Sequence, residues 1–236
     1  MNDERSTPDD RERDPAGGDG QDRGGATVAA GASAEAPVPE ELWGGAFGDA
    51  YVERNASLDE RRAAFWRDLL DDLRSSTVLE VGCGQGGNIG PLSRLLPPDQ
   101  VWGVDVNETA LARARANAPG TNLSQASARA LPFPDRSFDL VFTMGVLIHQ
   151  PDDLLPAVMD EIVRVADRFV LAGEYHADET VALDYRGVQG ALFKRDYGRL
   201  YLERYPSLTL RRSGFLDQDA GFDRLTVSVL ERRADG

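Results

Sequence analysis

Short apolar runs that alternate with amphipathic stretches organise this chain from about residue 41 onward. The run 77–81 is apolar and contains β-branched residues, which predicts a buried strand. Several glycines follow it, and the segment from Asn88 to Leu96 then carries apolar residues at helical spacing. A strand, a glycine turn and a helix in this order are typical of a nucleotide-binding α/β fold, in which ligands bind at the carboxyl edge of the sheet.

Later apolar runs continue the same order of strands and helices. Further strands are expected at 101–105, 123–128, 140–143 and 168–174, and apolar spacing predicts a helix at 153–165. Residues 57–60 fit a capping box before another helix, and Asn107 fits the N-cap of a helix that contains Ala110 and Leu111. Near the end, 208–215 and 225–231 predict two strands joined by a short loop.

Composition separates residues 1–40 from the remainder. This segment is rich in Gly, Asp, Arg, Ala and Pro and has few apolar residues, so we expect a disordered leader. Residues 41–236 are enough for one α/β domain with a substantial core. No apolar run reaches the length of a membrane span or a signal peptide, which predicts a cytoplasmic protein with no membrane partner.

Charge and the scarce reactive residues narrow the function further. The net charge of −14 repels phosphate backbones, so nucleic acid is not an expected partner and a small-molecule substrate is. Cys83 is the only cysteine, which excludes an internal disulfide framework. His149 and His176 are the only histidines, and without a nearby carboxylate motif we expect no metal site. The oligomeric state stays open.

The glycine turn allows two interpretations. Gly82, Gly84 and Gly87 satisfy the dinucleotide pattern G-x-G-x-x-G. The same stretch reads Glu80-x-Gly82-x-Gly84-x-Gly86, which closely resembles the E-x-G-x-G-x-G motif of class I S-adenosylmethionine (SAM) methyltransferases. A carboxylate at Glu80 suits the sulfonium and ammonium of SAM better than it suits a pyrophosphate, which seeks backbone N–H groups.

The resemblance to this family extends over about residues 41–232. The block 131–141 is similar to the family's L-P-F-x-D-x-S-F-D-x-V block, and the last two predicted strands match its closing hairpin. Asp105 ends the second strand about twenty residues past the glycines, where a carboxylate accepts both ribose hydroxyls. The resemblance implies a Rossmann-like α/β fold, with a mostly parallel seven-stranded sheet, an antiparallel closing hairpin and helices on both faces.

SAM is the cofactor that this resemblance implies, and its binding residues carry over by position. The glycines would let the backbone wrap the methionine moiety, and Ser127 stands where the family usually has an acid that contacts adenine. The expected cofactor-binding residues are Tyr51, Arg54, Glu80, Gly82, Cys83, Gly84, Gly86, Asn88, Asp105, Val106, Ser127, Ala128, Met144 and Gly145.

Two segments are expected to cover the site. Residues 41–57 would form an N-terminal lid, and 175–200 a substrate-cap insertion after the fifth strand. Together with 145–149, these segments resemble methylases associated with pseudaminic acid biosynthesis. The expected substrate-binding residues are Tyr175, Tyr185, Arg186, Lys194 and Arg195, of which the three basic ones suit an anionic group and equally suit solvated surface.

His149, Glu174 and His176 are the candidate catalytic residues. Each lies at or just beyond the carboxyl end of a predicted strand, and each can accept a proton from a hydroxyl. The alternative for His149 is a hydrogen bond that holds the loop before Pro151, and for the other two a role in ending the strand.

The sequence as a whole predicts SAM-dependent methyl transfer to a small-molecule oxygen or nitrogen nucleophile, in a sugar, nucleotide or secondary-metabolite pathway. Two alternatives stay open. One is an NAD(P)-dependent oxidoreductase, which would share the glycine turn. The other is a protein that binds SAM without transferring its methyl group.

Overall fold

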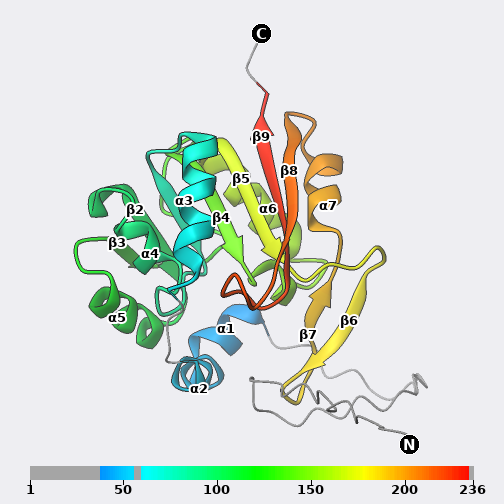
Figure 1. Cartoon of the computed structure of the whole chain (residues 1–236). Coiled ribbons are helices and arrows are strands. Elements are labelled where there is room, and N and C mark those ends of the chain that lie inside the picture. Colours follow the sequence, from blue (N-terminus) through cyan, green and yellow to red (C-terminus); the bar gives the residue numbers. More distant parts are fainter. Residues whose placement is uncertain (1–37, 56–59, 234–236) are drawn as a thin grey trace, which may run out of the picture. The chain divides into compact units, whose positions relative to one another are not determined.

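A seven-stranded sheet forms the centre of the computed structural model, which describes residues 38–55 and 60–233 (Figure 1). All of these residues belong to one compact unit, Glu35–Gly236. The strand order is β3-β2-β1-β4-β5-β9-β8. The strands are β1 (Val78–Val81), β2 (Val101–Asp105), β3 (Asn122–Gln125), β4 (Phe138–Met144), β5 (Ala166–Glu174), β8 (Leu208–Leu216) and β9 (Leu225–Arg232).

Strands β1 to β5 are parallel, and β9 pairs antiparallel with both β5 and β8. The chain order reverses at β1, since β2 lies on one side of it and β4 on the other. Ligands of open α/β sheets bind at such a switch point, beyond the carboxyl ends of the strands. The glycine turn after β1 therefore lies where a cofactor site is expected.

Alternating side chains of the strands supply two apolar cores, one on each face of the sheet. Leu140, Phe142 and Leu171 pack with α3 and α4 on one face, whereas Val141 and Val170 pack with α6 and α7 on the other. The helices that cover the sheet are α3 (Arg62–Leu73), α4 (Ile89–Ser93), α5 (Glu108–Asn117), α6 (Leu155–Val165) and α7 (Tyr197–Arg204), with 3₁₀ turns η1 (Pro98–Gln100) and η2 (Leu147–His149).

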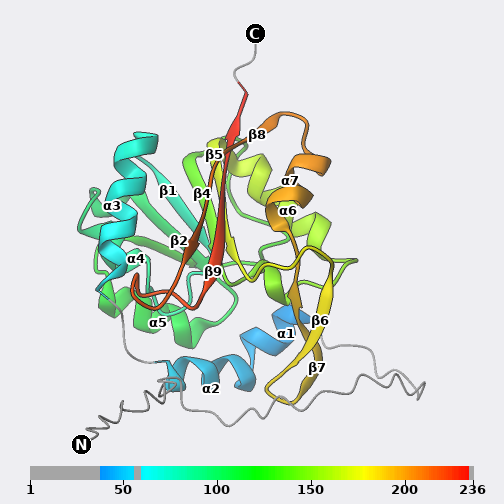
Figure 2. The ribbon, with the colours of Figure 1, turned by 45° about the vertical axis from the view of Figure 1, so that its right-hand side comes forward.

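Two further elements lie at the carboxyl end of the parallel strands (Figures 1 and 2). Helices α1 (Pro39–Gly44) and α2 (Ala46–Arg54) lie below this edge, and the separate two-stranded hairpin of β6 (Val181–Tyr185) and β7 (Val188–Lys194) lies beside them. We call α1 and α2 the lid and β6–β7 the side hairpin. The lid reaches the glycine turn through a hydrogen bond from the Gln85 side chain to the Asn55 carbonyl.

The predicted fold class is confirmed: the sheet is seven-stranded and mostly parallel, with an antiparallel pair at its end and helices on both faces. The side hairpin was not predicted. Four of the five β6 residues are exposed, so this strand shows no alternation of buried and exposed positions. The predicted leader lies mostly outside the described residues, as does the capping box apart from Glu60, which forms an ion pair with Arg94.

Candidate functional site

The glycine turn leaves β1 with backbone geometry that favours glycine. Gly82, Gly84 and Gly86 have φ angles of 77°, 52° and 87°. At Gly82 there is also no room for a side chain, because a Cβ atom would lie 2.4 Å from a methyl group of Val146. The turn is tied to β2 through the Val104 carbonyl oxygen, which accepts hydrogen bonds from the Gly82 and Cys83 N–H groups at 2.8 and 3.0 Å.

Glu80 lies beneath this turn as a buried carboxylate with one satisfied oxygen. Its Oε1 accepts a 2.6 Å hydrogen bond from Asn88 Nδ2, while its buried Oε2 has no hydrogen-bond partner among residues 38–55 and 60–233. Burial raises the pKa of Glu80 to about 8. An unpartnered buried oxygen is a free acceptor, so the turn carries a ready partner for a cationic group.

Asn88 connects Glu80 to two residues of α3. Its Oδ1 accepts 3.3 Å hydrogen bonds from Trp66 Nε1 and from an Arg62 guanidinium nitrogen. Arg62 also donates from Nε to the Gly221 carbonyl in the β8–β9 loop, at 2.8 Å, and stacks over the Phe222 ring. Arg62 thus joins α3, the helix after the glycine turn and the C-terminal strand pair.

Asp105 holds the turn from the other side. Its Oδ2 accepts from the Gly84 N–H at 2.8 Å and its Oδ1 from the Asn107 N–H at 2.9 Å. Asn107 caps α5, since its Oδ1 accepts from the Ala110 N–H at 2.7 Å. The carboxylate of Asp105 therefore stands between the glycine turn and α5, at the position from which the predicted ribose contact would be made.

The lid is attached to the sheet edge by polar contacts. Asn107 Nδ2 donates to the Trp43 carbonyl oxygen and to Asp49 Oδ1, both at 3.0 Å. An Arg113 nitrogen donates to the Val52 carbonyl at 3.0 Å. At the end of α2, the Asn55 carbonyl accepts from the Gln85 side chain in the glycine turn.

At the first turn of the lid, Glu40 forms an ion pair with Arg129, and the Ser127 hydroxyl also donates to Glu40. Ser127 Oγ in turn accepts from the Arg129 N–H at 3.0 Å. A carboxylate thus does stand beside the position that was predicted to contact adenine, but it comes from α1.

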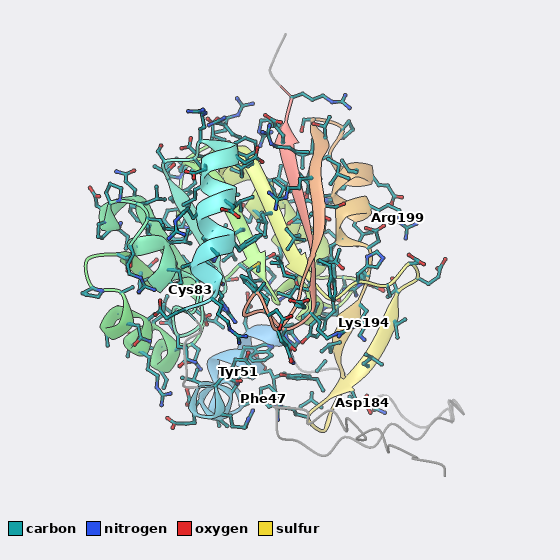
Figure 3. The ribbon with its side chains drawn as sticks, in the orientation of Figure 1. Phe47, Tyr51, Cys83, Asp184, Lys194 and Arg199 are labelled. Atoms are coloured by element: carbon teal, nitrogen blue, oxygen red, sulfur yellow. The ribbon has the colours of Figure 1, made fainter. Side chains whose placement is uncertain are left out.

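Five rings meet between the lid and the side hairpin, and we call them the aromatic cluster: Trp43, Phe47, Tyr51, His149 and Tyr185. Trp43 is at its centre, with ring centroids 5.2 Å from Phe47, 5.3 Å from Tyr51 and 4.6 Å from His149. Figure 3 shows Phe47 and Tyr51 on α2, beside the hairpin that carries Asp184. All five side chains are half-buried.

His149 has a defined hydrogen bond in this cluster. Its Nδ1 lies 2.7 Å from the Ala191 carbonyl oxygen, so Nδ1 carries the hydrogen and Nε2 keeps its lone pair in the neutral ring. Burial lowers the pKa of His149 to about 4. The imidazole is therefore neutral near pH 7, with Nε2 available as an acceptor. This hydrogen bond joins His149 to β7 of the side hairpin, and not to the loop before Pro151 that was expected as its alternative partner.

Glu174 accepts hydrogen bonds from backbone N–H groups of the loop that carries His149. Its two oxygens accept from the Val146 N–H at 3.3 Å and the Ile148 N–H at 3.2 Å. It is buried, and burial raises its pKa to about 7. The structure thus gives Glu174 a positioning task, with both oxygens occupied.

Arg195 is buried as well, and its guanidinium is committed to protein partners. It donates to the Gln150 carbonyl at 3.0 Å and to Asp152 at 2.7 Å. These bonds fix the loop after η2. A guanidinium held in this way is not presented to a ligand, so we leave Arg195 out of the acceptor site.

The remaining predicted substrate and catalytic residues are spread along the side hairpin and its base. Arg186 lies at the hairpin tip beside the Tyr185 ring, and Lys194 lies beside the Tyr175 ring. The Tyr175 hydroxyl donates to Asp223 in the β8–β9 loop, and His176 lies 3.2 Å from the exposed Asp178. Arg54 is exposed at the end of α2.

The other predicted cofactor residues line the strand ends. Gly145 follows β4 with a φ of 72° and donates from its N–H to the Gly173 carbonyl at 2.8 Å, next to the half-buried Met144. Val106 follows β2 and accepts from Gln125 at 2.8 Å. Cys83 is buried, and burial raises the pKa of its thiol, so it acts as a small apolar residue. Ala128 packs against the core.

Sequence reasoning missed Trp43, Arg62 and Asp223. Trp43 stood in the predicted lid, and its size beside Phe47 and Tyr51 was a usable signal. Arg62 and Asp223 gave none, because they meet their partners only through contacts across 26 to 159 residues of chain.

Comparisons with known proteins indicate which family the domain resembles. Residues 78–168, from β1 through α6 into β5, match the methyltransferase domain family. This segment is therefore similar to methyltransferase domains, and the fold is the one that SAM-dependent methyltransferases adopt. SAM is accordingly the cofactor of this domain, and the glycine turn with Glu80 and Asp105 is its expected binding edge.

Two curated relatives show how far the similarity of the methyltransferase domain reaches. A fatty-acid O-methyltransferase of Mycolicibacterium smegmatis is 40% identical over 75 residues, which cover 31% of this chain and 27% of the relative. A tRNA U34 carboxymethyltransferase of Idiomarina loihiensis is 34% identical over 178 residues, which cover 70% of this chain and 52% of the relative. The chain thus spans about half or less of the length of these relatives.

Solved structures share the architecture of the methyltransferase domain. Magnesium protoporphyrin IX methyltransferase from Synechocystis with bound S-adenosylhomocysteine (SAH) superposes with a TM-score of 0.63 at 17% identity, over 82% of this chain and 98% of that one. The 1,6-didemethyltoxoflavin-N1-methyltransferase of Burkholderia thailandensis gives 0.64 at 17% identity, over 85% and 93%. No helix in the described part of the chain is long and apolar enough to cross a membrane.

Proposed function

We propose that this chain transfers the methyl group of SAM to an oxygen or nitrogen nucleophile of a small molecule. The observation that carries the proposal is the buried Oε2 of Glu80, which has no partner in the described residues and lies beneath the glycine turn. A cationic cofactor would favour the ionised form of this carboxyl group and could pair with it, whereas a pyrophosphate would be repelled by that form.

The residues at the edge fit the parts of SAM. The turn of Gly82, Gly84 and Gly86 would hold the methionine end, with open space beside Gly84, and Asp105 would contact the ribose. When bound, SAM supplies an electrophilic methyl group on a sulfonium, which leaves as the neutral thioether SAH. The task left to this chain is to align the acceptor and to accept its proton.

We assign to His149 the task of taking up the proton that the acceptor loses. Its Nδ1 is fixed on the Ala191 carbonyl, so Nε2 faces its surroundings as a lone-pair acceptor. A histidine of such low pKa is a weak base, but a hydroxyl that has just been methylated is an oxonium and a very strong acid. Transfer of its proton to Nε2 is therefore downhill, and water can remove the proton afterwards. Glu174 positions the loop on which His149 lies.

The net charge of −14 supports a small molecule over a nucleic acid. The resemblance to methylases associated with pseudaminic acid biosynthesis supports a biosynthetic acceptor of this kind. It also raises an anionic sugar as a candidate, for which Arg186 and Lys194 would be the binding residues.

Calorimetric titration tests the cofactor, with SAM, SAH and NAD as ligands of the full chain. We expect SAM and SAH to bind and NAD not to bind, and binding of NAD alone would refute the proposal. Production of SAH with a panel of acceptors then separates methyl transfer from simple binding. A protein that binds SAM but yields no SAH above the rate without acceptor, with any acceptor class, would support the non-catalytic alternative.

A further inference from the structure

The aromatic cluster belongs to neither of the two cores of the protein. Trp43, Phe47, Tyr51 and His149 are absent from both buried core clusters, and only Tyr185 packs against the edge of one. Large rings that are half-buried and gathered outside a core are typical of a ligand-binding surface. The cluster also contains His149, to which we assign the acceptor's proton.

A recess beside the cluster is lined without any charged side chain. Its walls comprise Trp43, His149, Leu42, Ala191 and two prolines. Charged residues make up 28% of this sequence, so an uncharged lining at the carboxyl edge is a property of the site and not of the surface in general. An ionised acceptor placed there would lose its hydration without gaining a counter-charge.

Of the predicted basic residues, only Arg186 lies beside the cluster, and it is exposed at the hairpin tip, where water screens its charge. Arg195 is buried on its own partners, and Lys194 lies at the far end of the side hairpin from Arg186, paired in register with Val181. The faces of aromatic rings carry partial negative charge and so disfavour an anion above them. The Arg186 guanidinium already lies 5.7 Å from the centre of the Tyr185 ring, so a cationic acceptor would have to displace it from this ring.

The shape of the cluster favours a flat ligand over a long chain. The rings come from four elements, α1, α2, η2 and the end of β6, and most pairs stand edge to face or tilted. Such rings offer both faces and edges to a further ring at contact distance. Pro39 and Pro151 are among the lining residues of the recess, which gives it two rigid walls.

On this basis we propose that the acceptor is a neutral, planar aromatic molecule, a hydroxyarene or an N-heterocycle, whose O–H or N–H hydrogen-bonds to His149 Nε2 between the lid and the side hairpin. This inference rests on the proposed function and names its substrate class. In the transfer, the acceptor's lone pair forms the new bond to the methyl carbon while the carbon–sulfur bond breaks and its electron pair stays on sulfur. The acceptor's proton passes to Nε2 and then to water.

The test measures binding to the full chain saturated with SAH, with three probes. The probes are 2-naphthol (planar and neutral), 1-decanol (neutral and aliphatic) and glucuronate (an anionic sugar acid). We expect 2-naphthol to bind at least about tenfold more tightly than either of the others. With SAM in place of SAH, mass spectrometry should detect 2-methoxynaphthalene. Equal or tighter binding of decanol or glucuronate would overturn the inference.

Matched variants locate the binding. Tyr185→Leu and Phe47→Leu each remove one ring of the cluster. Phe133→Leu removes a half-buried ring that also has two edge-to-face partners, Trp102 at 5.7 Å and Phe138 at 5.0 Å, but lies in the segment before β4. We expect the first two variants to lose naphthol affinity about tenfold and Phe133→Leu to keep it. Equal losses in all three variants would refute the assignment.

SAH titration of the wild-type chain separates this inference from the proposed function. If the wild-type chain binds SAH and 2-naphthol has no advantage, the substrate class is wrong and the methyltransferase proposal survives. If the wild-type chain does not bind SAH or SAM, the proposed function itself is refuted, and the inference is refuted with it.

Discussion

Replacing Glu80 by glutamine tests the electrostatics of the glycine turn. Glutamine has nearly the same shape, and its Oε1 can still accept the hydrogen bond from Asn88 Nδ2. The change removes a buried ionisable group whose pKa rises from 4.5 in an unfolded chain to about 8 in the folded one. At pH 7 the folded protein must therefore hold a proton that the unfolded chain has lost.

The size of the effect follows from this difference in pKa. The gap between 4.5 and pH 7 is about 2.5 units, or about 3 kcal/mol of lost stability. The new amide leaves an N–H₂ group where Oε2 had no partner, which costs about 1 kcal/mol. We expect Glu80→Gln to be more stable than the wild type by about 2 kcal/mol at pH 7, or roughly 4 to 8 °C in Tm for a chain of this size.

The dependence on pH is the decisive measurement. A carboxyl group with a raised pKa contributes stability that is fully present below about pH 4.5 and is lost as the pH rises through about 8. Thermal unfolding of the ligand-free proteins should therefore show an advantage of the variant that is absent near pH 5 and grows toward pH 8. An advantage that is the same at pH 5 and pH 8 would refute the assigned pKa.

Glu174→Gln is the matched control for this experiment. Glu174 is equally buried and also has a raised pKa, but both of its oxygens accept backbone N–H groups. Glutamine would also remove the cost of this raised pKa, but an amide can replace only one of the two acceptors, so this variant should gain less stability than Glu80→Gln. Calorimetry should further show that Glu80→Gln binds SAM at least about tenfold more weakly, because the cation then loses its charged partner.

Further predictions concern other residues of the site. Asn107→Ala removes the cap of α5 and the tether of Trp43 and Asp49, so it should cost about 1 to 2 kcal/mol in denaturant unfolding and increase hydrogen exchange in the lid; unchanged exchange in the lid would contradict the tether. Arg195→Met should lower stability by about 2 kcal/mol with little change in the acceptor KM of the folded fraction, since it leaves the buried Gln150 carbonyl without its donor; a large rise in KM without loss of stability would contradict the structural role. His149→Phe should leave SAH binding unchanged and lower kcat by about a hundredfold, with SAH formation as the measurement; wild-type kcat would remove His149 from the mechanism.

The strands of the main sheet and their succession along the chain could be predicted from the sequence, because burial on both faces leaves apolar runs at β1, β4 and β5. The closing pair β8–β9 is confirmed within one residue of its predicted bounds. The side hairpin could not be predicted, because its register is set by Tyr185 and Val188 around a turn with left-handed Arg186 and Gly187, and its first strand is exposed.

Individual site residues were harder to predict than the fold. Position along a strand fixed where Glu80 and Asp105 would lie, because the carboxyl ends of parallel strands meet at one edge. The burial of Arg195 could not be predicted in this way, because its hydrogen-bond partners, the Gln150 carbonyl and Asp152, lie more than 40 residues away in the sequence. The same holds for the carboxylate of Glu40, which reaches Ser127 across 87 residues.

The three contacts of Arg62 have a consequence for engineering the chain. Arg62 donates hydrogen bonds both to Asn88 and to the Gly221 carbonyl, which lies in the loop between β8 and β9. The last two strands therefore help to hold the cofactor edge, although they lie outside the matched segment 78–168. A shortened version that ends before β8 would keep every glycine of the turn but would lose the hydrogen bond from Arg62 to the Gly221 carbonyl. Minimal SAM-binding fragments of this protein should therefore keep β8 and β9.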